Sequence, residues 1–340
     1  MREDNRKDYD SSEEKPKRKK FNLFNFLYER NAKKREDLVY DPNHKRDFLF
    51  FFRMLFDHKS NLFYINLMTV FGDFPVFLIL LVFSGNIHLR MSAPADPLFA
   101  PIYGAMYFSS GSPSTAALFG IYGSTAKIDV WTPLTYIVLI AGLLLLAFTF
   151  GPVNVGTSYI LRNIVKGEPV FLWTDFWYAI KRNLKQEFVF GALDLGFLML
   201  SVYDVYFFYI NYHTSSSMSS MFSVFFCLGI FITIAYIVMR FYIYLMMITF
   251  DLSIKKLLKN ALIFTVIGFK RNIVALFGIA VAVFLNYVIA TVYPPIGIIL
   301  PFIITVSLCS FMAAYAAWPK IKEIMIDPYA DENQEEAEEA

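Results

Sequence analysis

The long apolar runs of this chain constrain its fold more than any other feature. Six segments, at 62–86, 134–161, 187–210, 222–250, 273–293 and 295–318, are predominantly apolar. About 20 such residues in a helix cross a hydrocarbon core of about 30 Å. Only 18% of the residues are charged, whereas soluble domains average about a quarter. The sequence therefore predicts an all-α polytopic membrane protein with six transmembrane helices.

Lysine and arginine alternate between the two sides of these predicted spans. Residues 1–61 carry sixteen of them, and the connections 162–186 and 251–272 carry five each, whereas the connection 211–221 carries none. Because basic residues accumulate in cytoplasmic connections, both termini are expected in the cytoplasm. The predicted organisation is a basic N-terminal region (1–46), a six-span membrane domain (47–318) with an external insertion (85–133), and an acidic tail (319–340).

A short motif recurs at the cytoplasmic entry to alternate spans. The pattern Lys-x-Asn-aliphatic occurs at 59–62, 181–184 and 270–273, and an amphipathic stretch precedes each copy, at 47–58, 174–185 and 251–269. These stretches are typical of helices that lie in the membrane interface. The pattern favours three repeats, each an interfacial elbow helix followed by a two-span hairpin. Chance matching of Lys- and Asn-rich juxtamembrane segments stays the alternative.

The middle elbow has the clearest two-faced pattern. Phe176, Ile180 and Leu184 share one helical stripe beside two tryptophans, and Lys181 and Lys185 fall on the opposite face. Thr174 or Asp175 is suited to cap the start of this helix. Asn183 is expected at the turn between the in-plane helix and the span.

Three charged residues lie inside the predicted spans, namely Asp73, Asp194 and Arg240. A charge in hydrocarbon is costly and is usually paired or functional. Asp194 and Arg240 lie at similar depths in two antiparallel spans, so an ion pair between them is predicted. Its role is either structural, fixing helix register, or part of a substrate or proton pathway. Asp73 lies two residues from Pro75, which is expected to kink the first span.

The external segment 93–131 holds many small and aromatic residues but only three charges. Two hypotheses fit this composition. One is a re-entrant or membrane-hugging loop, which needs protein or water to satisfy its backbone. The other is a flexible external loop.

The stretch from Gly151-Pro152 through "VNVGTSYILRNIV", "GEP" and "WTDFWYAIKRNLKQ" resembles the YesL family, also called domain of unknown function 624. The resemblance covers 61–83 and 148–318, and its motif positions are Gly151, Pro152, Asp175, Phe176, Asn183 and Asn260. It implies a bacterial plasma membrane, often of a Gram-positive organism, and genes near those for carbohydrate uptake and breakdown. It implies no activity. This chain departs from shorter members in its basic N-terminal region and its external insertion.

The sequence lacks the motifs of common catalytic and metal sites. It contains no His-Glu-x-x-His, P-loop or Gly-x-Ser-x-Gly motif. Its two cysteines, Cys227 and Cys309, are too few for a metal cluster. Neither an enzyme nor a cofactor nor a metal is therefore predicted. The importer-type Glu-Ala-Ala loop is also missing from 162–186 and 251–272.

The basic segment 15–35 is expected to contact anionic membrane lipid, because each basic residue near such a surface contributes about 1 kcal/mol. A disordered tail stays the alternative. Nucleic acid is not expected as a partner. Two functions stay open. The first is a non-enzymatic accessory or assembly partner of a carbohydrate transport system, in contact with the membrane subunits of an importer. The second is a transporter or channel that uses Asp73, Asp194 and Arg240.

Overall fold

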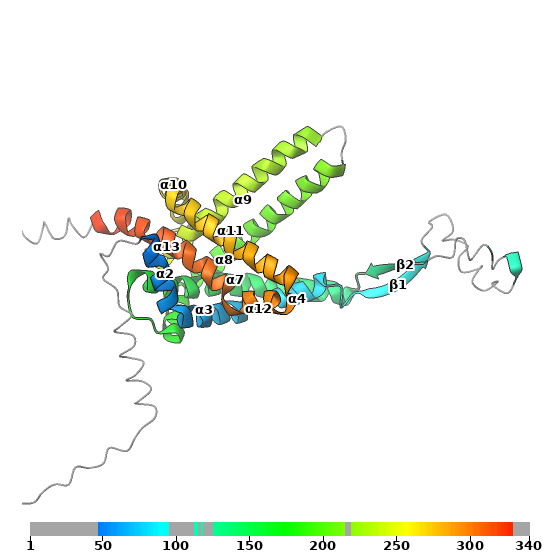
Figure 1. Cartoon of the computed structure of the whole chain (residues 1–340), viewed down its shortest axis with the longest axis horizontal. Helices are drawn as coiled ribbons and strands as arrows, with labels where there is room; N and C mark the ends of the chain where they lie inside the picture. The colour runs from blue at the N-terminus through cyan, green and yellow to red at the C-terminus, as the bar shows by residue number, and fades with distance from the viewer. Residues whose placement is uncertain (1–46, 95–111, 115–116, 118–124, 215–218, 329–340) are drawn as a thin grey trace, which may run out of the picture.

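The computed structural model describes residues 47–94, 112–114, 117, 125–214 and 219–328. These residues form helices and one two-stranded ribbon (Figure 1). The start of α2 (Phe48–Asp57) and the end of α13 (Val306–Met325) lie at one end of the molecule, and the ribbon projects from the other. The basic region 1–46 and the last residues of the acidic tail lie outside the described residues.

Five helices of the described chain are long and apolar enough to cross a membrane. They are α7 (Pro133–Lys166), α8 (Leu172–Thr214), α9 (Ser219–Met247), α11 (Phe269–Val292) and the combined helix Pro294–Met325. A sixth crossing is added if the bent pair α3 (Lys59–Gly72) and α4 (Pro75–Phe83) forms one span. The molecule is therefore a helical protein with five or six possible spans.

The first predicted span is broken in the middle. Its halves, α3 and α4, meet at an angle of 65°. Pro75 occupies the first position of α4, where its missing N–H costs nothing, and Asp73 caps the end of α3. The expected kink near Pro75 is confirmed.

Two of the three predicted elbows are separate helices. The first is α2, which ends at a corner formed by His58, and the third is α10 (Ile254–Ile267), which ends at Gly268. Both corners come before the Lys-x-Asn motif rather than at its asparagine. Asn272 stabilises the second corner, since its amide donates to the Thr265 carbonyl and its oxygen accepts from the Tyr242 hydroxyl.

The expected turn at Asn183 is wrong. Helix α8 runs unbroken through it, and the Asn183 side chain donates to the Ala179 carbonyl one turn earlier. The residues that match the corners at His58 and Gly268 are Ala179 and Ile180, both of which continue a helix without difficulty. The three-repeat architecture is therefore not confirmed.

The last span contains an irregular segment. Helix α12 (Pro294–Leu300) leads through a π-helical turn, η1 (Pro301–Thr305), into α13. The buried Asn66 side chain on α3 holds this turn, donating to the Pro301 carbonyl and accepting from the Ser307 amide. Helix α13 continues to Met325. The boundary expected at 318, between membrane domain and tail, therefore lies inside a helix.

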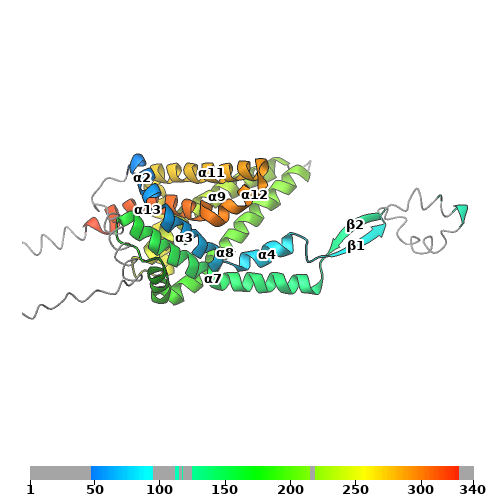
Figure 2. The same cartoon turned by 60° about the horizontal axis from the view of Figure 1, so that its bottom comes forward.

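The described part of the external insertion includes an antiparallel β-ribbon. Strand β1 (Leu89–Pro94) pairs with β2 (Thr125–Val130), with Leu89 opposite Val130 and Pro94 opposite Thr125. Figure 2 shows the ribbon standing away from the helices. Neither of the two hypotheses for this segment, a re-entrant loop or a flexible loop, included a β-ribbon. Most of the residues between the two strands lie outside the described residues.

Candidate functional site

A buried acid joins α8 to α9. Asp194 is fully buried, and three side chains from one stripe of α9 reach it, spaced four residues apart. The Tyr236 hydroxyl donates to one carboxylate oxygen at 2.7 Å, and the Tyr244 hydroxyl donates to the other at 2.5 Å. Arg240 places its Nε 3.0 Å and 2.9 Å from the two oxygens. The predicted ion pair is confirmed, with two tyrosines that the sequence analysis did not anticipate.

The environment of Arg240 favours its charge. Its guanidinium lies 5.4 Å from the centre of the Phe150 ring and 5.8 Å from that of Tyr244. Rings at these distances attract a cation through their electron-rich faces. Asp194 accepts hydrogen bonds from three side chains and is closed to solvent. The Asp194–Arg240 pair therefore holds α8 and α9 together.

Helices α7 and α8 cross closely at Gly191, which lies about one turn before Asp194 on α8. A Cβ added to Gly191 of α8 would stand 2.4 Å from the Cα of Gly151 of α7. Only glycine on both helices permits this approach, which resembles small-residue contacts in membrane proteins. Pro152 follows within α7, and both Gly151 and Pro152 are buried. These two family-motif residues therefore position α7 against the helix that carries Asp194.

Glu187 is the second acid on this face of α8, and the sequence analysis missed it. It precedes Asp194 by seven residues, which places the two on one helical stripe. Its side chain is fully buried, and neither carboxylate oxygen has a hydrogen-bond partner among the described residues. The seven-residue spacing from Asp194 was the signal available in the sequence.

Asp73 lies near this cluster but outside the ion pair. It stands at the break between α3 and α4, and Gly72 beside it contacts Val153 of α7 closely. The charge of Arg240 acts on its carboxyl group. One Asp73 oxygen, Oδ1, is buried without a hydrogen-bond partner among the described residues. Among the described residues, Glu187 thus has two buried oxygens without a hydrogen-bond partner, and Asp73 has one.

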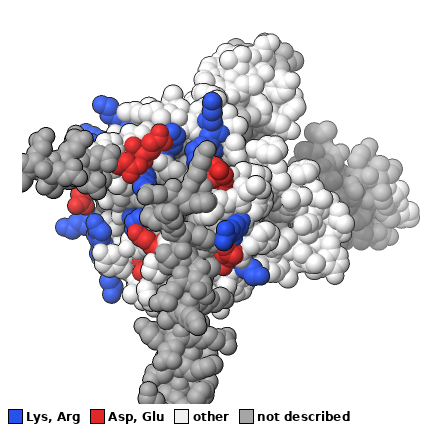
Figure 3. Space-filling model, turned by 60° about the vertical axis from the view of Figure 1, so that its left-hand side comes forward, with Lys and Arg blue, Asp and Glu red and all other residues white. Residues whose placement is uncertain are grey.

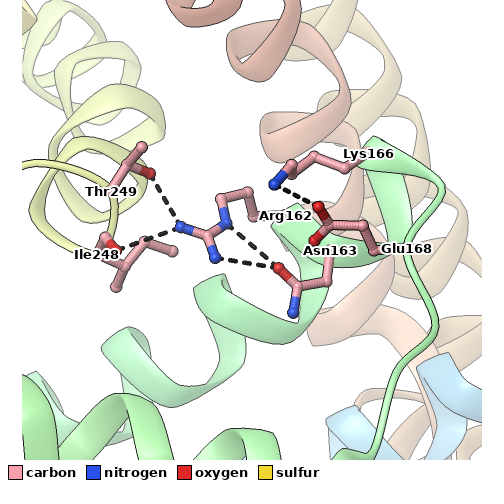
Figure 4. A network of polar contacts seen from close by, with 6 residues as sticks. All are labelled: Arg162, Asn163, Lys166, Glu168, Ile248 and Thr249. Atoms are coloured by element: carbon pink, nitrogen blue, oxygen red, sulfur yellow. Dashed lines mark hydrogen bonds and ion pairs between the residues drawn. The ribbon is translucent and has the colours of Figure 1, made fainter. Parts of the chain in front are cut away.

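A second polar network joins the end of α7 to the residues that follow α9 (Figure 4). Arg162 is buried near the end of α7, where its guanidinium donates to the Asn163 side chain, the Ile248 carbonyl and the Thr249 hydroxyl. The Ile248 carbonyl follows the last residue of α9, so Arg162 satisfies a helix-end acceptor. Helix α7 continues to Lys166, so Arg162 lies inside the helix rather than in the connection predicted to begin at 162.

The other residues of the predicted motif lie on α8 and α10. Asp175 accepts from the Phe171 amide at 2.8 Å and caps α8, as expected. Phe176 is buried against Gly156 of α7, where a Cβ would stand 2.5 Å from its ring. Lys181 is exposed, and Asn260 is half-buried on α10. Of these residues, Phe176 packs α8 against α7.

In the part of the chain that the structure describes, no group of three or more His, Cys, Asp or Glu side chains is placed to hold a metal ion. The two described cysteines, Cys227 and Cys309, are not bonded to each other. Comparison of the chain with protein-family models, with curated proteins and with solved structures finds no match.

Proposed function

We propose that the protein is a non-enzymatic accessory protein of the bacterial plasma membrane that binds another membrane protein through the α8–α9 hairpin. The hairpin projects from the other helices (Figure 1). None of the residues 195–214 and 220–235 is buried, whereas Asp194 and Tyr236, at its base, are. Residues 195–214 and 220–235, here called the hairpin arm, are thus uncovered, whereas the base of the hairpin is buried. This contrast is the main support for the proposal.

The uncovered arm has polar groups that hydrocarbon does not satisfy. Asp204 is half-buried on α8, and no ion pair of its carboxylate is found among the described residues. Tyr203 and Tyr206 beside it are exposed. Acids and hydroxyls on membrane helices favour partners on neighbouring helices, because lipid tails offer no hydrogen bonds. A partner helix with a basic or amide side chain near Asp204 fits this arm.

The base of the arm is fixed independently of any partner. The Asp194–Arg240 pair and the Gly151–Gly191 crossing anchor α8 and α9 to each other and to α7. A rigid base reduces the conformational entropy that the arm loses on binding, which favours association.

We further propose that the partner is a membrane subunit of a carbohydrate importer. The support for this step is the resemblance of 61–83 and 148–318 to the YesL family. Exposed lysines and arginines occur on α10 and at the start of α8, and Figure 3 shows basic side chains on one face of the molecule. The positive-inside rule supports a cytoplasmic location for such basic segments.

Purification from the native membrane in a gentle detergent tests this proposal. We expect importer subunits to co-purify with the protein, and Asp204→Asn or Phe231→Ala to reduce their yield. Asp251→Asn and Phe284→Ala are the matched controls, because Asp251 lies outside the hairpin and Phe284 is exposed on α11. Equal yields from all four variants, or no co-purifying membrane protein, would contradict the proposal.

A transporter or channel is the second candidate, and one observation favours it. Glu187 is buried and Asp73 is half-buried, and each has at least one buried carboxylate oxygen without a hydrogen-bond partner among the described residues. Such groups are typical of proton or cation pathways. Uptake of solute by the purified protein in liposomes, lost in Asp73→Asn and Glu187→Gln, would support this candidate over the first.

A further inference from the structure

An apolar groove with a volume of about 790 Å³ runs along helix α11. Helix α11 forms one wall, α12, η1 and α13 form the other, and the aromatic face of α2 closes one end. Helices α11 and α13 lie side by side (Figure 2). No residue of the hairpin arm, 195–214 and 220–235, lines this groove.

The groove is long enough to follow a lipid chain. Its lining on α11 begins at Lys270 and ends at Ile289, which is roughly 28 Å along a helix. This length approaches the thickness of the hydrocarbon core, about 30 Å. The lining between these ends consists mainly of aliphatic and aromatic side chains, as an acyl chain requires.

Small residues keep the groove open. Ala275, Gly278 and Ala282 follow one another on the lining face of α11. A Cβ at Gly278 would lie 3.0 Å from the sulfur of Met312 on α13, so these two residues form the floor. Larger side chains at these positions would fill the space between the two helices.

Charge distinguishes the two ends of the groove. Lys270 and Arg271 lie at the end near α2, with Asp47 as the opposing acid, whereas Asn286 lies toward the other end. Lys270 is exposed. Arg271 is fixed, since its guanidinium donates to the Ala316 and Tyr315 carbonyls. The two cations exceed the single acid, so this end favours an anionic group.

We infer that the groove binds an anionic glycerophospholipid from the bilayer, with the phosphate at Lys270 and one acyl chain along α11. A chain that spans half of the hydrocarbon core reaches from Lys270 to about Val281. Gly278 therefore lies under the chain, and Ala282 lies at its end. The inference uses no residue of the basic segment 15–35 and does not depend on the proposed function.

Native mass spectrometry of the full-length protein tests the inference. The protein is extracted from vesicles of phosphatidylglycerol and phosphatidylcholine in equal parts. The retained lipid is identified from the mass that it adds to the protein. We expect one phosphatidylglycerol molecule per chain. Lys270→Ala should weaken retention about fivefold, as expected for one basic residue near a phosphate. Ala282→Trp should abolish retention by filling the groove.

Lys259→Ala is the matched control, because Lys259 is an exposed lysine of α10 that does not line the groove. It should retain phosphatidylglycerol as the unmodified protein does. Equal losses in Lys270→Ala and Lys259→Ala would mean general attraction of lipid to a basic surface and would overturn the site. Equal retention of phosphatidylcholine, or retention by a folded Ala282→Trp variant, would also overturn it.

Discussion

The Nε atom of Arg240 on α9 lies 2.9 Å from the buried carboxylate of Asp194 on α8, so two opposite charges on separate helices neutralise each other. Asp194→Asn or Arg240→Gln alone strands the other charge, which for a buried pair costs roughly 3–5 kcal/mol. We expect each single variant to lower the folded yield, measured by monodisperse protein in detergent. The double variant should recover much of it, because two amides can hydrogen-bond. Simply additive losses would show that the residues are not coupled.

The crossing of α7 and α8 should be sensitive to a single methyl group. In Gly191→Ala the new Cβ would stand 2.4 Å from the Gly151 Cα, so the two backbones must separate. Overpacking of this kind costs roughly 1–3 kcal/mol. Gly196→Ala is the control on the same helix, because a Cβ there meets nothing within 4 Å. Thermal unfolding in detergent should separate the two variants, and identical midpoints would refute the close crossing.

Arg271 should be coupled to Pro319. Because proline has no N–H, the Tyr315 carbonyl lacks its usual helical donor, and Arg271 supplies one at 3.0 Å. Arg271→Leu should therefore destabilise the protein by roughly 1–3 kcal/mol. In a Pro319→Ala background the loss should be smaller, since the new N–H bonds to the same carbonyl. A double-mutant cycle of unfolding free energies with no coupling energy would argue against this relationship.

His58 should make stability depend on pH. Burial at the corner between α2 and α3 lowers the pKa of His58 from its usual 6.5. Above that value the imidazole is neutral in both states, and its full contribution to stability is present. As the pH falls below 6.5, His58 takes up a proton in the unfolded state before it does so in the native state, so the native state loses stability. The loss stops growing once the pH is below the lowered pKa of His58 in the native state.

His58→Gln should flatten this part of the pH dependence, because glutamine stays neutral and keeps a donor for the Met54 carbonyl. The measurement is the unfolding midpoint in detergent between about pH 7.5 and pH 5. An unchanged slope in the variant would assign the pH dependence to other groups.

The orientation in the membrane is open to direct labelling. A cysteine at Ser216, in the link between α8 and α9 and outside the described residues, should react from outside the cell with an impermeant thiol reagent. A cysteine at Lys256, exposed on α10, should not. Both are introduced in a background without Cys227 and Cys309. The opposite labelling pattern would reverse the predicted orientation and move the basic face to the exterior.

The sequence by itself determined that the chain forms long apolar helices able to cross a membrane, the positions of these helices, and the kink near Pro75. Runs of about 20 apolar residues and the missing proline N–H are local properties, so they can be recognised without knowledge of packing. The pairing of Asp194 with Arg240 was also predictable, because two charges at similar depth in adjacent antiparallel helices have few other partners.

Tertiary structure alone decided the features that depend on contacts between distant segments. Asn183 carries the same motif as Asn61 and Asn272, yet α8 runs straight through it, since its preceding residues favour a helix. The Gly151–Gly191 approach brings together two glycines forty residues apart, and the burial of Arg162 follows from the Ile248 carbonyl. Tyr236 and Tyr244 belong to the site because the crossing of α8 and α9 turns that stripe of α9 toward Asp194. Such contacts depend on the distance and rotation between helices, which the periodicity of a single segment does not contain.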